Sequence, residues 1–234
     1  MKLSLLASVA LAAVTTAEGY TFTRLNKTDA ALLVVDQQLG LSTLVSDYDP
    51  TVFRQSILAH AALGKLFNLP TILTTSADTG TLIVLCIPIL LSSTAKARTT
   101  KVDAWDNPDF RAAVQATGKK QIILAGIVTE VCTSFLALSL REAGYEVWAN
   151  TDASGTFNDK LAADANRRME QAGVHLMGMF GIAMDLMRDW RNTPGASEVL
   201  PFLDQYLVPY SLVARNHVYA IENGTLIPGE AQIL

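Results

Sequence analysis

The sequence predicts an α/β protein with a doubly wound parallel sheet, in which helices cover both faces and form three layers with it. Apolar runs of strand length, several of them rich in β-branched residues, recur along the chain and alternate with longer segments of helical spacing. This alternation is typical of right-handed βαβ units. With 234 residues, half of them hydrophobic, the chain is long enough for one such domain with a substantial core.

The first half of the predicted domain begins with a strand over residues 30–38, whose sequence AALLVVDQQ is a continuous apolar run up to Asp36. Such runs are typical of strands buried on both faces of a parallel sheet. A helix over residues 49–68 begins at an Asp-Pro pair, and TILTTS, residues 71–76, follows as the second strand. The third strand is expected to end among three basic residues, Lys96, Arg98 and Lys101.

The second half repeats the alternation, and most of its helices are bounded by an Asn-Pro pair or by a glycine. The predicted strands are 121–126, 145–150 and 174–178, and the predicted helices are 107–118, a helix around Cys132 that ends at Gly144, 160–173 and 181–190. Ligands of doubly wound sheets bind at the carboxyl ends of the strands. Asp36 and Cys132 both lie at such ends, so they are the first candidates for a site.

The amino-terminal residues 1–17 have the layout of a secretory signal peptide: Lys2, then an apolar stretch, then small residues up to Ala17. A buried or membrane-anchoring helix is the alternative, although the stretch is shorter than the roughly 20 residues that a membrane span needs. We therefore expect a secreted protein. The predicted domain covers residues 18–195, and residues 196–234 are expected to form an irregular extension because they contain several prolines.

The charge and the motifs exclude several classes of partner. A net charge of -4 and a pI near 5.3, without any Lys/Arg cluster, give no electrostatic footprint for nucleic acid. No glycine-rich phosphate-binding motif follows any predicted strand, and no apolar run after the leader is long enough to cross a membrane. We expect a small-molecule substrate and no cofactor.

Cys132 is the candidate nucleophile, because it lies where a predicted strand turns into a helix. Unpaired N–H groups at such a turn favour a thiolate and can bind an oxyanion. Asp36 is the candidate proton acceptor, and the three basic residues offer a cation. Three other interpretations remain open: a buried free cysteine, a structural disulfide between Cys132 and Cys86, and a structural role for Asp36.

Several segments in order resemble the isochorismatase-like hydrolase superfamily, specifically its YcaC-type cysteine hydrolases. The resemblance runs from about residue 23 to 192 and is carried by DAALLVVDQQLGL, NLPTILTTSADTG, AWDNPDF, MDLMRDWRN and the long segment ATGKKQIILAGIVTEVCTSFLALSLREAGYEVWANTDASGTFN. It implies a six-stranded parallel sheet flanked by helices and a catalytic triad of Asp36, Arg98 and Cys132. The segment GTLIVLCIPILLSSTAKAR, residues 80–98, departs from the polar loop that the family has there.

The resemblance also implies a site around the triad. A cis peptide bond is expected at Val128-Thr129, where backbone N–H groups would bind an oxyanion, and we assign Gln38 and Trp105 to substrate binding. Nicotinamidases of the superfamily bind a metal through an Asp and two His. Here His60 has no second histidine near it in the sequence, so we expect no catalytic metal.

The function that the resemblance implies is hydrolysis of a small amide or related C–N substrate through a thioester on Cys132, by a homo-oligomeric enzyme. The alternative is a catalytically inactive secreted member that serves as a binding or structural protein. A peroxide-reactive thiol protein is a third interpretation, for which Cys86 is the one available resolving cysteine.

Overall fold

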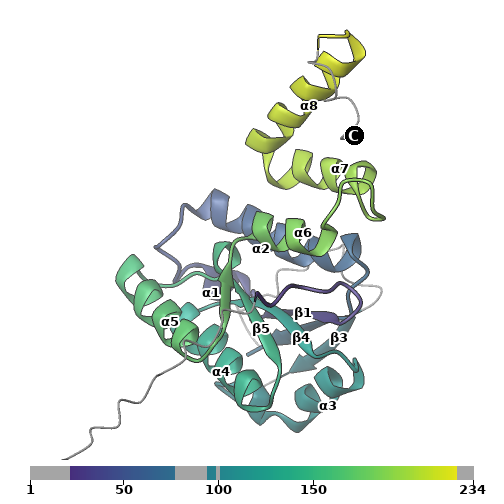
Figure 1. The fold of residues 1–234 in the computed structure, drawn as a ribbon. Helices are drawn as coiled ribbons and strands as arrows, with labels where there is room; N and C mark the ends of the chain where they lie inside the picture. Colours follow the sequence, from purple (N-terminus) through teal and green to yellow (C-terminus); the bar gives the residue numbers. More distant parts are fainter. Residues whose placement is uncertain (1–21, 77–93, 99–100, 226–234) are drawn as a thin grey trace, which may run out of the picture.

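A computed structural model describes residues 22–76, 94–98 and 101–225 of the chain, with residues 94–98 as backbone (Figure 1). The predictions for the leader 1–17 and the atypical run 82–91 lie outside the described residues. None of the described helices combines the length and the apolar character that crossing a bilayer requires.

The structure confirms the predicted parallel sheet, which has six strands in the order β3-β2-β1-β4-β5-β6. The chain moves outward from β1 through β2 to β3, then returns beside β1 and moves outward in the other direction. The β1–β4 pair is therefore the point where the strand order reverses, and ligands of open α/β sheets bind beside that point. The strands are β1 (Ala30–Val35), β2 (Thr71–Thr75), β3 (Thr94–Arg98), β4 (Gln121–Gly126), β5 (Glu146–Asn150) and β6 (His175–Met177).

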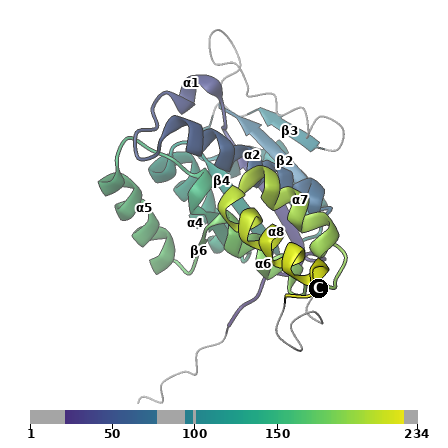
Figure 2. The ribbon, with the colours of Figure 1, turned by 90° about the horizontal axis from the view of Figure 1, so that it is seen from above.

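Helices cover both faces of the sheet, as Figures 1 and 2 show. Successive residues of a strand point to opposite faces. Accordingly, Leu32 and Val34 of β1 pack with α2 and α6, whereas Leu33 and Val35 belong to the core formed with α3, α4 and α5. These helices are α2 (Pro50–Leu66), α3 (Pro108–Ala116), α4 (Ser134–Glu142), α5 (Asp159–Gln171) and α6 (Met179–Met187).

The helix ends follow the local sequence signals. Asp49 caps α2 by accepting two N–H bonds of the first turn, and Asn107 caps α3 in the same way. Gly144 and Gly173 follow α4 and α5 with φ of 89° and 79°, a backbone conformation that glycine adopts without a steric penalty. Short helices and turns connect these elements. They are α1 (Leu39–Ser42), η2 (Ala104–Asp106), η3 (Thr129–Thr133), which is a π-helical turn, and η4 (Thr151–Ala153).

The prediction of an irregular extension after residue 195 is wrong, because two helices form there, α7 (Ala196–Tyr206) and α8 (Val208–Glu222). Gly195 precedes the first turn of α7, and its N–H donates to the Glu198 carboxylate at 2.8 Å, which caps the start of the helix. Pro209 lies in the first turn of α8, where a missing N–H leaves no bond unmade, and Pro201 removes a single bond inside α7.

Candidate active site

Asp36 directly follows β1 and is held by its neighbour on β2. Its side chain is 2% exposed, and its backbone is left-handed with φ of 51°. The Thr74 hydroxyl donates to Asp36 Oδ1 at 2.7 Å and accepts from the Asp36 N–H at 3.1 Å. Because Asp tolerates the left-handed region better than most residues, these two bonds fix the carboxylate at the carboxyl edge of the sheet.

Gly126 ends β4 in close contact with β1. A Cβ atom at this position would lie 2.7 Å from the Val35 carbonyl oxygen, so a larger residue would push the two strands apart. The chain then passes through the π turn η3 into α4, and this turn carries Cys132. Cys132 is half-buried and is a free thiol, whereas the other cysteine, Cys86, lies outside the described residues.

The non-proline cis peptide lies at Ile127-Val128, one bond earlier than the predicted Val128-Thr129. The Val128 and Cys132 N–H groups point at Cys132 Sγ, whereas the Thr129 N–H donates to the Gly155 carbonyl at 3.1 Å. The prediction that Thr129 supplies an oxyanion N–H is therefore wrong, because that group already bonds the neighbouring loop. The oxyanion role of Val128 stays a prediction.

Asp36 and Cys132 meet in a hydrogen bond between the carboxylate and the thiol. Burial, the Asp36 charge and this bond together raise the pKa of Cys132 to about 12, and the two N–H groups oppose the rise. Burial also raises the pKa of Asp36 above its usual value, against the bonds from Thr74 and Cys132. With these contacts of the described residues, the thiol keeps its proton at neutral pH. The N–H groups of the turn lower the thiol pKa, as expected, but burial and Asp36 raise it by more.

Arg98 is the last residue of β3, and its Cα pairs with Thr75 at the end of β2. Its backbone therefore reaches the same carboxyl edge as Asp36, while its side chain lies outside the described atoms. Arg98 therefore lies at the end of the third strand, as predicted, and its catalytic role stays a prediction.

Two residues assigned to substrate binding have other surroundings. Gln38 is fully buried, and its Oε1 accepts from the Ser76 N–H at 2.9 Å, so it ties the end of β1 to the segment after β2. The Trp105 ring packs edge-on against Phe110 and Tyr145, at centroid distances of 6.4 and 5.8 Å. Since Tyr145 immediately precedes β5, Trp105 lies toward the amino ends of the strands, away from Asp36.

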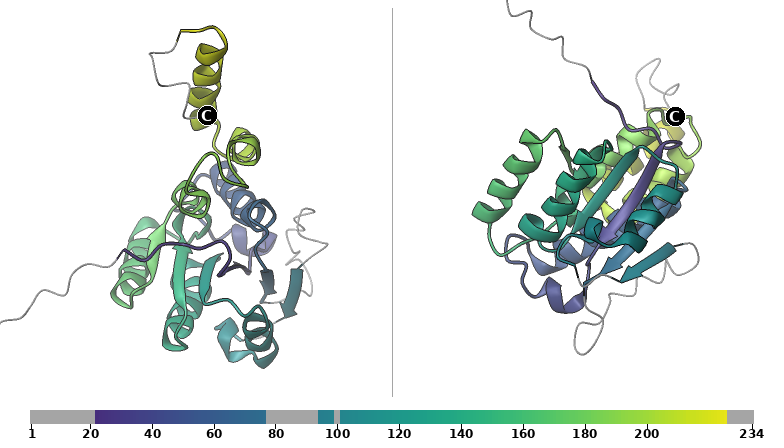
Figure 3. Two further views of the ribbon diagram at one scale, coloured as in Figure 1. Left: turned by 45° about the vertical axis from the view of Figure 1, so that its right-hand side comes forward. Right: turned by 90° about the horizontal axis from the view of Figure 1, so that it is seen from below.

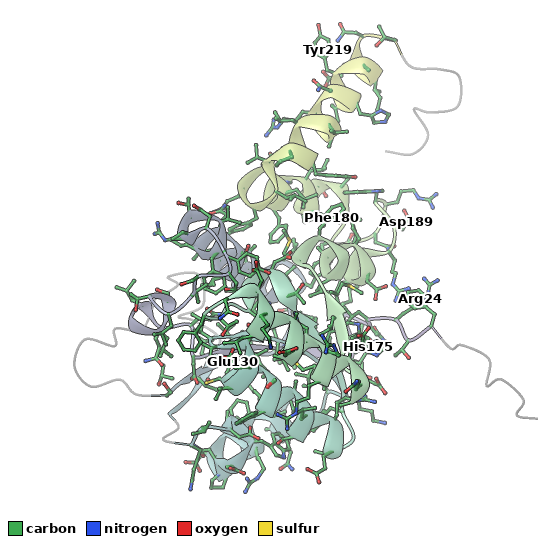
Figure 4. All side chains as sticks on the ribbon, turned by 90° about the vertical axis from the view of Figure 1, so that its left-hand side faces the viewer. Arg24, Glu130, His175, Phe180, Asp189 and Tyr219 are labelled. Carbon is green, nitrogen blue, oxygen red and sulfur yellow. The ribbon has the colours of Figure 1, made fainter. Side chains whose placement is uncertain are left out.

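A hydrogen-bonded cluster of Glu130, Thr156 and Asp47 lies beside the turn that carries Cys132, and the sequence analysis did not predict it. The Thr156 hydroxyl donates to the Glu130 carboxylate, and the Thr156 N–H donates to Asp47 Oδ1 at 2.8 Å. Burial, followed by the nearby Asp159 and Glu130 carboxylates, raises the pKa of Asp47. Figure 4 shows Glu130 near the centre of the α/β domain. This cluster thus connects the Cys132 turn to two loops that are distant in sequence.

His60 is a packing residue of α2. It is fully buried, its Nε2 donates to the Leu33 carbonyl at 3.0 Å, and its Nδ1 accepts from the Asn150 amide at 3.1 Å. Burial lowers the pKa of His60 to about 4, so the ring is neutral. Among the described residues, no group of three His, Cys, Asp or Glu side chains is arranged to hold a metal ion.

Comparison with known proteins shows the family of the chain. The isochorismatase domain family matches residues 30–179, which include the sheet, Asp36 and Cys132. The chain belongs to the isochorismatase family. One relative in this family, the probable hydrolase YcaC of Escherichia coli, is 52% identical over 175 residues, which cover 73% of this chain and 84% of the relative.

Two solved structures extend the similarity to nearly the whole of each relative. The E. coli YcaC structure, described as an octameric hydrolase of unknown specificity, aligns with a TM-score of 0.79 and 44% identity over 86% of this chain and 98% of that chain. YcaC from Pseudomonas aeruginosa, which contains hexane-2,5-diol and a covalent acrylamide, aligns with a TM-score of 0.78 and 42% identity over 85% of this chain and 98% of that chain.

Proposed function

We propose that this protein is a cysteine hydrolase that cleaves a small amide or related C–N substrate through a thioester on Cys132. The observation that carries the proposal is the hydrogen bond between the Cys132 thiol and Asp36, beside two N–H groups that face the sulfur. A nucleophile next to a fixed base, with oxyanion donors at hand, is the arrangement that acyl transfer needs. The covalent acrylamide in the P. aeruginosa relative supports a reactive nucleophile in this group of proteins.

In the first half of the reaction, Sγ attacks the substrate carbonyl carbon while Asp36 accepts the thiol proton. The carbonyl π electrons move to oxygen, and the Val128 and Cys132 N–H groups hold the resulting anion. When the tetrahedral intermediate collapses, the C–N bond breaks and protonated Asp36 returns its proton to the leaving nitrogen. The products of this half are ammonia or an amine and the Cys132 thioester.

In the second half, water attacks the thioester. Asp36 accepts a proton from this water, the C–S bond breaks, and the proton passes to the departing sulfur. The carboxylic acid leaves and the starting thiol is restored. The high pKa of the thiol suits this cycle, because the proton moves to Asp36 only as the carbon–sulfur bond forms. Arg98, the cation that the family resemblance implies, would stabilise the carboxylate and the developing negative charge from the end of β3.

Ammonia release from a panel of small primary amides tests the proposal. We expect turnover by the wild-type protein, none by Cys132→Ala, and a loss of about 10³-fold in kcat for Asp36→Asn, because general-base catalysis is worth 10²–10⁴-fold. Asp164→Asn, which removes an exposed carboxylate on α5, is the matched control and should keep wild-type activity.

Acrylamide labelling supplies a second readout that needs no substrate. Peptide mapping should find the adduct on Cys132. Ammonia release by Cys132→Ala at the wild-type rate would contradict the proposal. A thiol that remains unlabelled, together with no turnover of any amide, would favour a catalytically inactive binding protein.

We also propose that the protein is exported and assembles with copies of itself. The signal-peptide layout of residues 1–17 supports export, as do two asparagines in glycosylation sequons, Asn26 and Asn223, which are both exposed. Sequencing the amino terminus of protein recovered from the culture medium tests export, since cleavage after Ala17 is expected. Recovery only from cells, with Met1 retained, would contradict it. The octameric E. coli relative supports self-assembly.

A further inference from the structure

The turn η3, which brings Cys132 beside Asp36, makes few hydrogen bonds that would fix its own position. It is a π-helical turn, in which the Thr133 N–H donates to the Val128 carbonyl at 3.3 Å, and no side chain caps its start. The hydroxyls of Thr129 and Thr133 are buried without a hydrogen-bond partner among the described residues. Contacts with a neighbouring segment therefore have to hold the turn where its sulfur meets the carboxylate.

That neighbouring segment is residues 155–156, in the loop that leads into α5. The Thr129 N–H donates to the Gly155 carbonyl at 3.1 Å, and the Glu130 carboxylate accepts from the Thr156 hydroxyl. Two consecutive residues of the turn thus bond two consecutive residues of the loop. The helices that follow these segments, α4 and α5, pack side by side on one face of the sheet (Figure 3). The two bonds therefore join the segments that lead into two neighbouring helices.

Thr156 is a fixed point for the turn, because its own loop is tightly held. Thr156 is fully buried, its N–H donates to Asp47 Oδ1 at 2.8 Å, and its carbonyl accepts from the Ser46 N–H at 2.8 Å. Beside it, Gly155 leaves no room for a side chain, since a Cβ atom there would lie 2.6 Å from Val45 Cγ1. A shift of η3 would therefore move the turn relative to this loop and break the bond between them.

Glu130 and Cys132 point in different directions from the turn. Side chains two positions apart on a helical turn do not face each other. Accordingly, Glu130 bonds Thr156, whereas Cys132 bonds Asp36. The Glu130 carboxylate is thus directed away from the sulfur, and its effect on the reaction has to pass through the position of the backbone.

We infer that Glu130 is a positioning residue, whose bond to Thr156 holds η3 so that the Cys132 sulfur faces Asp36. The inference rests on the proposed function, in which this sulfur attacks a carbonyl carbon. Attack requires close alignment, and a displacement of about 1 Å can lower the rate by about 10²-fold. The bond from the Glu130 side chain is the one that a substitution can remove, because the parallel bond from Thr129 is a backbone bond.

The kinetics of ammonia release from small primary amides test the inference. Glu130→Ala should lower kcat by about 10²-fold and change KM by less than about threefold, because the side chain is directed at Thr156. Glu130→Gln, whose amide oxygen can still accept from the Thr156 hydroxyl, should keep kcat within about threefold of wild type. Glu142→Ala, which removes an exposed carboxylate at the end of α4, is the control with wild-type kinetics. Wild-type kcat in Glu130→Ala, or equal losses in Glu130→Ala and Glu130→Gln, would overturn the inference.

Thr156 supplies the other side of the bond. Thr156→Val should lower kcat by an amount comparable to Glu130→Ala, and Thr156→Ser, which keeps the hydroxyl, should restore most of it. The double variant Glu130→Ala/Thr156→Val should lie within about threefold of either single variant, because both changes remove one interaction. Losses that multiply in the double variant would overturn the inference. If Glu130→Ala does not fold, the two Thr156 variants decide, and equal kcat in both would overturn it.

A thiolate titration separates failure of the inference from failure of the proposed function. Asp36 raises the pKa of Cys132 through its charge and its bond, so a displaced turn should carry more thiolate. With Cys132→Ala as the baseline, Glu130→Ala should give at least about threefold more thiolate at pH 9 than the wild type, and Glu130→Gln the wild-type amount. If the wild type releases no ammonia from any amide, the proposed function fails and the titration still decides the inference. Equal thiolate in Glu130→Ala and the wild type would overturn it.

Discussion

Two regions of the molecule treat their side chains in opposite ways. One is the carboxyl edge of the sheet at β1 and β4, and the other is the α7–α8 hairpin. At the edge, Asp36 bonds both Thr74 and Cys132 within one chain. On the hairpin, apolar side chains such as Leu212 and Tyr219 face outward. The comparison shows that strand-turn-helix geometry brings the polar groups of the edge together within one chain, whereas the hairpin leaves several apolar side chains in contact with water.

Matched leucine substitutions give the largest expected stability difference between the two regions. Leu124 of β4 is fully buried, so Leu124→Ala should lower the free energy of unfolding by about 3 kcal/mol. Leu212→Ala should change it by less than about 0.5 kcal/mol, because that side chain already contacts water. Urea unfolding at low protein concentration, followed by tryptophan fluorescence, measures both. Similar losses in the two variants would mean that α8 is stabilised within the monomer.

Acid sensitivity should also be located in the α/β domain, at His60. Its folded-state pKa of about 4 lies below the unfolded value of 6.5, so its contribution to stability is present above pH 6.5 and is lost as the pH falls toward 4. Between pH 7.5 and 5 the wild type should lose about 2 kcal/mol more than His60→Gln. Urea unfolding at the two pH values checks this, with His217→Gln on α8 as the control. Equal losses in the wild type and His60→Gln would contradict the assignment.

Removing the bond that fixes Asp36 should affect stability less than the Leu124 substitution or the titration of His60, and should have a visible effect on catalysis. Thr74→Val removes a hydroxyl of similar size and should cost about 1 kcal/mol of unfolding free energy. It removes a bond that lowers the pKa of Asp36, so the acid limb of the kcat profile should move to higher pH. Thr75→Val, the neighbouring residue on β2, serves as the control. An unchanged acid limb in Thr74→Val would mean that Asp36 is not the base.

Much of the fold could be predicted because its signals are local. Continuous apolar runs identify strands buried on both faces, as in β1 and β4, and the cap residues Asp49 and Asn107 mark helix starts. The α7–α8 hairpin could not be predicted as easily, since its prolines suggest irregular chain. The helical spacing of Val199, Phe202 and Leu203, which are buried, was the available signal.

The site was predictable at the level of positions and less so at the level of contacts. Strand ends place Asp36 and Cys132 at one edge, because parallel strands finish together. Which N–H groups face the sulfur depends on the contacts of the folded turn, where the Thr129 N–H bonds the Gly155 carbonyl instead. The direction in which the pKa of Cys132 shifts depends on burial and on the contact with Asp36, which are properties of the folded chain. The same holds for Thr156, whose partners come from two distant loops.

The central claim is that the Cys132 thiol stays protonated at neutral pH and donates a hydrogen bond to Asp36. An ultraviolet titration of the thiolate tests it directly. Cys132→Ala provides the baseline, and the signal is followed from pH 6 to 10 in the wild type and in Asp36→Asn. Because the Asp36 charge raises the pKa of Cys132, the account predicts little thiolate in the wild type and more in Asp36→Asn, although that variant should hydrolyse amides far more slowly. A wild-type thiolate already present at neutral pH, or an Asp36→Asn curve at the wild-type position or above it, would contradict the account.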